Sequence, residues 1–184
     1  MKVTGKKCVL RDWMSKDLET YRQYNIGHHL WMDFNGPYYA NPSVLDVDEK
    51  IQKLIERIND REWGSRNKIV IADATTDQLL GTVNWYWQSQ ETNWKSIGIA
   101  IYDEEQWGKG LGEDALKLWV NYLFQQDKSL VRLDLRTWSG NKGMVKLAKK
   151  TGFVQEACFR KARIVKGEYY DSIGMGILRE EFYD

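Results

Sequence analysis

The segment Gln106–Gly112, which reads QWGKGLG, is the part of the sequence where residue types and spacing best fit a chemical role. Glycine at alternate positions, Gly108, Gly110 and Gly112, lets backbone N–H groups turn to one side without interference from a Cβ atom. A helical pattern follows at once, and a helix N-terminus adds free amides and the positive end of the helix dipole. The segment therefore predicts a site for a phosphate or pyrophosphate group, to which Lys109 adds a cation.

Two well-known phosphate-binding loops do not match this segment. The dinucleotide fingerprint G-x-G-x-x-G belongs in the first β–α unit, whereas here the third glycine comes one position early and the segment lies beyond the middle of the chain. The P-loop G-x-x-x-x-G-K-[ST] requires Ser or Thr after its lysine, but Gly110 follows Lys109. Hydride transfer and nucleotide hydrolysis are therefore disfavoured.

The elements on either side must hold this loop in place. Before it, the alternation in Trp94–Tyr102 predicts a strand with isoleucines on one side and Ser96, Gly98 and Ala100 on the other. Small residues weaken a strand unless something must approach it closely, so this side indicates either a bound ligand or tight packing within the sheet. After the loop, apolar residues at helical spacing predict a helix over about 110–126.

The rest of the chain alternates between the strand and helix periods. Further strands are predicted at 8–10, 69–72, 79–88, 131–135, 153–165 and 169–178, and further helices at 15–25, 47–58 and 141–151. Ser15 is the expected N-cap of the first helix, and Gly152 the left-handed cap of the last. Pro37 and Pro42 bracket a loop between two helical patterns, and residues 166–167 form a turn. The order predicts an α/β fold with a mixed sheet of about seven strands and about four helices.

Length and charge narrow the class of protein. The chain has 184 residues, which predicts a single domain over 1–184. Its 27 Lys and Arg against 26 Asp and Glu leave a net charge of +1, which disfavours a nucleic-acid-binding protein. The first residues lack the apolar run of a secretory signal, and no uncharged stretch is long enough to span a membrane. We therefore expect a soluble cytoplasmic protein that binds neither nucleic acid nor membranes.

The cysteines and histidines predict neither a disulfide nor a metal site. Cys8 and Cys158 lie far apart in the chain and form no CxxC pair. The adjacent His28 and His29 would point to different sides of a helix. Cys158 lies in an apolar strand without an evident His partner, so we interpret it as a core residue and not as a nucleophile.

Two motifs together resemble the GNAT N-acetyltransferases. Residues Gln106–Gly112 are similar to the Q/R-x-x-G-x-G/A loop with which that family binds the pyrophosphate of acetyl-CoA. The run from Asn141 through Gly152–Arg160, followed later by Asp171, is similar to the branch that acetylates the N-termini of ribosomal proteins. That branch shows N-x-x-S, then G-F-x-x-E-G, then a basic residue and a later Asp. The resemblance covers most of the chain and is strongest over about 94–178.

The resemblance implies the GNAT fold, acetyl-CoA as cofactor, and direct transfer of the acetyl group to a primary amine within a ternary complex. The acceptor would be a protein N-terminal α-amine or a small-molecule amine, and the enzyme a monomer or a homodimer. Main chain of the strand would pair with the pantetheine arm, and amides of the loop would hold the pyrophosphate. The implied cofactor residues are Ile99, Ala100, Ile101, Gln106, Trp107, Gly108, Lys109, Gly110, Leu111, Gly112, Asn141, Lys146 and Lys149. A non-catalytic module of the same fold that binds CoA or a nucleotide is the alternative.

This sequence departs from the family pattern at three positions. Met144 stands where the branch has Ser, Ala157 where it has Gly, and Ala148 where many members have the Tyr that protonates the leaving thiolate. No proton donor is therefore assigned. Because an ordinary thiol has a pKa of about 8.5, the thiolate can leave with modest help from water.

The base and the acceptor pocket are predicted with alternatives. The branch motif implies Glu156 as the group that takes the proton of the amine, and Asp33, Asp73 and Glu91 are alternatives that act directly or through a water. We expect the acceptor pocket to be lined from the early helices, the loop between the prolines and the tryptophan-rich strand, by Trp31, Asp33, Phe34, Tyr38, Trp85 and Trp87. Aromatic faces near Asp33 suit a cationic amine, whereas simple core filling would explain the same tryptophans.

Overall fold

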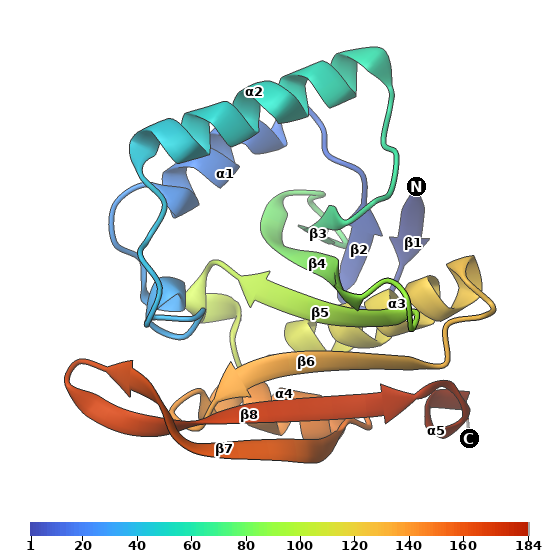
Figure 1. The fold of residues 1–184 in the computed structure, drawn as a ribbon. Helices are drawn as coiled ribbons and strands as arrows, with labels where there is room; N and C mark the ends of the chain where they lie inside the picture. Colours follow the sequence, from blue (N-terminus) through green and yellow to red (C-terminus); the bar gives the residue numbers. More distant parts are fainter. Residues whose placement is uncertain (184) are drawn as a thin grey trace.

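Strands with alternating or continuous apolar residues form one eight-stranded sheet in the computed structural model, which describes residues 1–183 (Figure 1). The strands are β1 (Lys2–Thr4), β2 (Cys8–Arg11), β3 (Lys68–Asp73), β4 (Leu79–Ser89), β5 (Trp94–Ile101), β6 (Arg132–Trp138), β7 (Val154–Val165) and β8 (Glu168–Leu178). Their order across the sheet is β1-β2-β3-β4-β5-β6-β8-β7, and every neighbouring pair is antiparallel except β5 with β6. The predicted mixed sheet is confirmed.

Helices pack on both faces of this sheet. They are α1 (Asp17–Asn25), α2 (Val44–Asp60), α3 (Leu111–Gln126), α4 (Lys142–Lys150) and α5 (Arg179–Tyr183), with the short 3-10 helices η1 (Leu30–Asp33) and η2 (Glu104–Gln106). We call the face that packs against α1 and α2 the front face, and the face that packs against α3 and α4, which lie behind the sheet in Figure 1, the rear face. Among residues 1–183, no helix combines the length and the apolar composition that crossing a bilayer requires.

Two apolar layers hold these helices to the sheet. In the rear layer, Trp119 of α3 packs with Leu133 and Leu135 of β6, all of them almost inaccessible to solvent. In the front layer, Tyr21 of α1 packs with Tyr102 at the end of β5. Burying one large apolar side chain contributes roughly 1.5–3 kcal/mol. The rear layer therefore anchors α3, and with it the glycine loop that leads into that helix.

The strands β5 and β6 separate soon after they pair. They are paired only at Lys95↔Leu133 and Ser96↔Asp134, and no ladder continues beyond these positions. On its other side β5 stays paired with β4 as far as Ile101. One edge of β5 after Ser96 therefore carries backbone groups that are not used by a neighbouring strand. An extended ligand can form hydrogen bonds to such an edge.

Local signals explain most element boundaries. A capping box between Ser43 and Asp46 starts α2, and Gly152, with a φ of +94°, ends α4 as predicted. The predicted turn at 166–167 is confirmed, with φ positive at both residues. The predicted N-cap Ser15 is wrong, because α1 begins at Asp17 after Lys16. The sequence did not predict β1 and α5, since three and five residues are too few to show a hydrophobic period.

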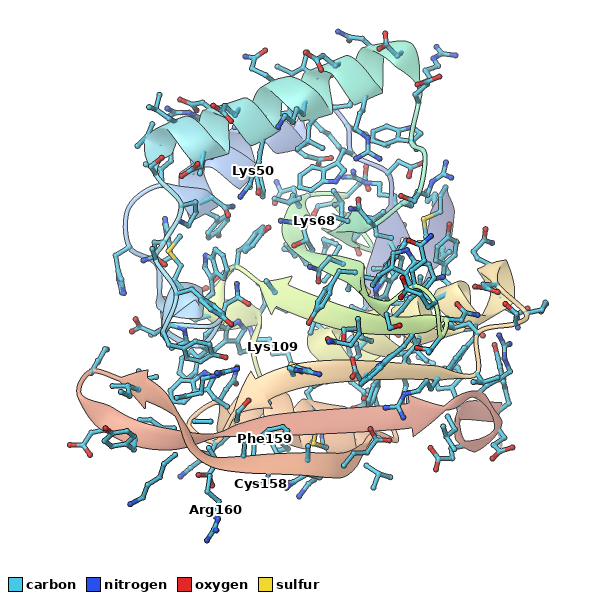
Figure 2. All side chains as sticks on the ribbon, in the orientation of Figure 1. Lys50, Lys68, Lys109, Cys158, Phe159 and Arg160 are labelled. Carbon is cyan, nitrogen blue, oxygen red and sulfur yellow. The ribbon has the colours of Figure 1, made fainter. Side chains whose placement is uncertain are left out.

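The prediction that Cys158 is a core residue is wrong. Its side chain is exposed on β7, the last strand of the sheet. Two register shifts, after Gln155 and after Phe159, interrupt the alternation of this strand against β8. In Figure 2 the side chains of Cys158, Phe159 and Arg160 lie at the outer edge of the sheet. An apolar run in the sequence therefore does not mark a buried strand here, because an edge strand has only one neighbour to cover it.

Lys68 of β3 supplies a testable pH dependence. It lies between α2 and the sheet (Figure 2), with its Nζ 5.1 Å from the ring centre of Tyr21 and with no carboxylate partner among residues 1–183. Burial lowers the pKa of Lys68 to about 8. The unfolded chain then binds the extra proton between about pH 8 and 10.5, so stability rises with pH across that window.

We therefore expect Lys68→Met to raise the free energy of unfolding by about 1 kcal/mol at pH 7, with a gain that shrinks by pH 10. Denaturant unfolding at both pH values measures the difference. Lys53→Met, at an exposed position of α2, is the matched control and should change stability little at either pH. An equal gain from Lys68→Met at pH 7 and pH 10 would contradict the electrostatic explanation.

Candidate active site

A cavity of about 470 Å³ lies where β5 and β6 separate. Its walls come from the segment around η1, from β5, from the glycine loop and the start of α3, from the end of β6, and from α4. The residues predicted from the sequence that line it are Trp31, Phe34, Tyr38, Ile99, Ala100, Ile101, Gln106, Trp107, Gly108, Gly110, Gly112, Asn141 and Lys146. The fold thus brings the predicted phosphate loop and part of the predicted acceptor pocket to one cavity.

The glycine loop carries backbone amides without partners. Gly108 and Gly110 have φ values of +72° and +85°, a region that favours glycine. The amides of residues 108–113 donate to no acceptor in the described part of the chain. The amide of Trp107, in contrast, donates to the carbonyl of Glu104 at 3.0 Å, so it drops out of the predicted set. A run of free amides that ends at a helix N-terminus is suited to a diphosphate.

Two lysines of α4 add positive charge to the wall of the cavity. Lys146 and Lys150 both line it, because residues four apart share one side of a helix. Lys150 was not predicted, and the predicted Lys149 does not line the cavity. Neither do two predicted loop residues: Lys109 is absent from the lining, and the side chain of Leu111 is buried in the rear layer.

Asn141 joins the segment between α1 and α2, which we call the acceptor segment, to α4. Its Oδ1 accepts from the amide of Met144 at 2.9 Å and so caps the helix, while its Nδ2 donates to the carbonyl of Phe34 at 3.1 Å. The indole of Trp138 donates to the same carbonyl at 3.1 Å. The amide group of Asn141 is therefore already engaged on both sides. Its position in the lining holds the two walls of the cavity together.

Thr137 of β6 is a lining residue that no sequence pattern indicates. It is only 5% exposed, and its hydroxyl oxygen has no hydrogen-bond partner among the described residues. Leaving a buried hydroxyl without a partner costs about 1–3 kcal/mol. An unpartnered hydroxyl in the wall of a cavity therefore fits a polar ligand. Together with the loop amides and the free edge of β5, it suits an extended cofactor that ends in a diphosphate.

Aromatic residues of the segment between α1 and α2 form the front wall of the cavity. Trp31 packs on Tyr102 with ring centres 5.1 Å apart, and Phe34 meets the edge of Trp107 at 5.6 Å. The guanidinium of Arg163 lies 4.6 Å from the ring centre of Tyr38. We call the part of the cavity that is lined by Trp31, Phe34, Tyr38, Arg136 and Trp138 the acceptor end.

Asp33 does not line this cavity, although its neighbours in the chain do. Its carboxylate is bonded to His28 at 3.0 Å and to Lys166, in the turn between β7 and β8, at 3.5 Å. These hydrogen bonds, above all the one with His28, lower the pKa of Asp33. The carboxylate is therefore occupied as a link between the acceptor segment and that turn.

Trp85 and Trp87 were predicted for the acceptor pocket, and the structure does not bring them there. They do share a face of β4, as the alternation predicts, but it is the rear face, outside the cavity lining. The Nζ of Lys95 lies 4.8 Å and 4.6 Å from their ring centres. Strand alternation shows which residues share a face, whereas the packing of α3 decides that this face is the rear one.

The predicted bases also lie outside the cavity lining. Glu156, on β7, accepts a hydrogen bond from Nη2 of Arg132 at 2.6 Å, so its carboxylate is held in an ion pair. Asp73 accepts from backbone amides of the turn after β3, and Glu91 from Ser89 in the turn after β4. Among the described residues, the acidic side chain in the lining is Glu113, at the start of α3, which pairs with Lys117 and Lys150. The structure therefore does not support a carboxylate base at the acceptor end.

The chain matches a known family and a curated protein over most of its length. The family model described as acetyltransferase (GNAT) domain matches residues 7–154. The SPbeta prophage-derived uncharacterized N-acetyltransferase YokL of Bacillus subtilis (strain 168) is 27% identical over 182 residues, which are 97% of this chain and 94% of that protein.

Solved structures share the fold. The spermidine N-acetyltransferase from Vibrio cholerae, in complex with CoA and spermine, superposes with a TM-score of 0.74 at 21% identity and covers 96% of this chain and 98% of that one. The ribosomal-protein-S5-alanine acetyltransferase from Vibrio fischeri superposes with a TM-score of 0.76 at 18% identity. The match covers 99% of this chain and 98% of that one. At such identities the likeness supports the fold alone. The family match, on a fold whose splayed strands meet a loop of free amides, shows that this chain belongs to the GNAT acetyltransferases, enzymes that use acetyl-CoA.

Proposed function

We propose that this enzyme transfers the acetyl group of acetyl-CoA directly to a primary amine while both reactants are bound. The observation that carries the proposal is the single cavity in which the free-amide loop and the acceptor end meet. Two reactants held in one cavity need no covalent relay through the protein. Positioning them supplies a large part of the rate enhancement that direct transfer requires.

The two cysteines support direct transfer over a relay. Cys8 is inaccessible in the rear layer, and burial raises its pKa to about 12. Cys158 is exposed on β7, outside the cavity lining, and partial desolvation together with the neighbouring Asp171 raises its pKa as well. A raised pKa reduces the fraction of thiolate at neutral pH, and the thiolate is the nucleophilic form. Neither cysteine is therefore placed to carry an acetyl group.

Different residues of the cavity would bind different parts of acetyl-CoA. The amides of residues 108–113 would hold the diphosphate, with Lys146 and Lys150 adding charge. The free edge of β5 would pair with the pantetheine arm, and Thr137 would donate its unpartnered hydroxyl. Bound acetyl-CoA supplies the activated carbonyl that the amine attacks. A backbone amide at the free edge of β5 would stabilise the negative charge that develops on the carbonyl oxygen.

The acceptor that we propose is a protein N-terminal α-amine or a small-molecule amine. The motif around Asn141 and Gly152–Arg160 supports the ribosomal-protein branch, and a ribosomal-protein-S5-alanine acetyltransferase shares the fold. A spermidine N-acetyltransferase shares the fold too, so the fold is compatible with small amines as well. Both classes present a primary amine, which fits a front wall of aromatic side chains.

We expect Glu156→Gln to leave kcat within about twofold of the wild-type value at neutral pH. Glu156 lies outside the cavity lining, and its exposed ion pair with Arg132 contributes only about 0–1 kcal/mol to the stability of the fold. The amine would then lose its proton to water. Initial rates from pH 6 to 9 test this, because solvent deprotonation predicts parallel profiles for both proteins. Loss of the rise with pH in the variant would instead assign the base to Glu156.

A thiol-release assay tests the proposed function. Purified enzyme is given acetyl-CoA and, in turn, small amines and short peptides with free N-termini, and CoA thiol is measured against a no-acceptor blank. Acceptor-dependent release is the expected result. Binding of CoA without release for any acceptor would instead identify the non-catalytic alternative, which the absence of a tyrosine at Ala148 motivates.

A further inference from the structure

Arg136 of β6 points to the front face at the point where the strands separate. Its neighbours Leu135 and Thr137 alternate with it, and Leu135 belongs to the rear layer. The last paired residues of the two strands are Ser96 and Asp134, and two positions beyond them lie Gly98 and Arg136. Arg136 therefore stands across the gap from Gly98, on the side from which the acceptor segment closes the cavity.

The guanidinium of Arg136 makes no direct contact with a counter-charge in the described part of the chain, although it lies close enough to the Asp134 carboxylate to interact with it electrostatically. Arg136 is exposed yet lines the cavity, and among residues 1–183 it makes no ion pair and no side-chain hydrogen bond. Across the sheet it pairs with Gly174 of β8, which has no side chain to offer an acceptor. On its own strand, Asp134 is buried and accepts from Ser96 and from the indole of Trp94. Five N–H donors thus remain available to a ligand.

The charges of the cavity separate into two regions. Glu113, Lys146 and Lys150 lie at the start of α3 and on α4, beside the loop of free amides. At the acceptor end, Arg136 is the charged residue of the lining, and the nearby carboxylate of Asp134 is buried outside the lining. A polyamine would meet this cation, because the carboxylate near it is already engaged by Ser96 and Trp94. Uncompensated like charges disfavour binding, whereas a planar guanidinium binds a carboxylate through two parallel hydrogen bonds.

We propose that Arg136 is the specificity-determining residue of the acceptor end, and that the acceptor is an amine which also carries a carboxylate, as an α-amino acid does. The inference rests on the proposed function and narrows its acceptors to small amines that carry a carboxylate, because a protein N-terminal residue has a peptide amide in place of that carboxylate. The carboxylate takes no part in the bond changes. The amine nitrogen forms the new N–C bond, the thioester C–S bond breaks, and the proton that the amine releases balances the charge of the thiolate.

The test compares amino acids with their primary amides, which differ only in the carboxylate, and includes spermidine as a polycation. Rates are expressed per unprotonated amine, because the amide is the weaker base. In the wild-type enzyme we expect kcat/KM for the acids to exceed that for the amides at least tenfold. Arg136→Gln should remove this preference, mainly by raising KM for the acids, and should leave the Kd for CoA unchanged. Arg136→Lys should restore part of the preference.

Arg160→Gln is the matched control, because Arg160 projects from the outer edge of β7 in Figure 2 and does not line the cavity. It should retain the full preference for the acids. Equal use of acids and amides by the wild-type enzyme, a preference for spermidine, or a preference that survives Arg136→Gln would overturn the inference while leaving acetyl transfer intact. Absence of acceptor-dependent thiol with every amine, in an enzyme that binds CoA, would instead overturn the proposed function.

Discussion

Replacing Gly108 by alanine is expected to weaken CoA binding about tenfold, which corresponds to about 1.4 kcal/mol. Gly108 has a φ of +72°, and a Cβ added there would meet no atom within 4 Å. The substitution therefore acts through the backbone alone. An alanine in this region costs about 1–2 kcal/mol, which the loop relieves by turning its amides away from the orientation that binds the diphosphate. Isothermal titration calorimetry with CoA measures the change.

Gly27→Ala is the matched control for this prediction. Gly27 has a φ of +78°, again with no atom within 4 Å of an added Cβ, but it lies before η1 and outside the cavity lining. Both variants should therefore lose similar stability, and only Gly108→Ala should lose CoA affinity. Unchanged affinity in Gly108→Ala, or an equal loss in Gly27→Ala, would show that the loop amides do not bind the diphosphate.

Asp17→Asn is expected to lower the free energy of unfolding by about 3 kcal/mol. Asp17 and Arg11 form a buried ion pair, with side chains that are 1% and 2% exposed. The two terminal guanidinium nitrogens, Nη1 and Nη2, donate to the carboxylate at 2.7 Å and 2.9 Å. Removing the negative charge leaves a buried guanidinium without its main partner. Breaking a buried pair in this way costs about 3–5 kcal/mol, and the second partner of Arg11, the half-exposed Asp77, offsets only part of it.

Asp48→Asn provides the comparison, since Asp48 pairs with Arg22 at 2.8 Å while both side chains are more than 40% exposed. An exposed pair contributes about 0–1 kcal/mol, so this variant should unfold at nearly the wild-type denaturant concentration. Urea unfolding of the two variants separates the effect of burial from that of charge. If both lost the same stability, burial of the Arg11 pair would not matter.

Features that depend on neighbours in the chain could be predicted from the sequence. Gly108, Gly110 and Gly112 indicated a loop whose backbone N–H groups turn to one side, and Gly108 and Gly110 do adopt a positive φ, a region that is costly for any residue with a Cβ. The helix after the loop, the cap at Gly152 and the turn at 166–167 followed from the same local reasoning. The family resemblance added the nature of the cofactor, since this loop is one of its two motifs.

Features that depend on distant pairing could not be predicted in this way. Trp85 and Trp87 share a face, as alternation requires, yet that face packs toward α3 and not toward the acceptor segment. Glu156 has the chemistry of a base, but Arg132, a residue of another strand, engages it. Nothing in the order of residues shows that Asp33 is bonded to Lys166, far along the chain.

The sequence by itself determined the glycine loop and the helix behind it, because backbone freedom and helix initiation are properties of adjacent residues. Only the tertiary structure decided which side chains surround the reacting groups. The parallel pair of β5 and β6 ends after Ser96 and Asp134, and this separation of two strands distant in sequence opens the cavity and presents Arg136 and Thr137 to it. Long-range strand pairing selects the register, and a register decides which side chains face one another.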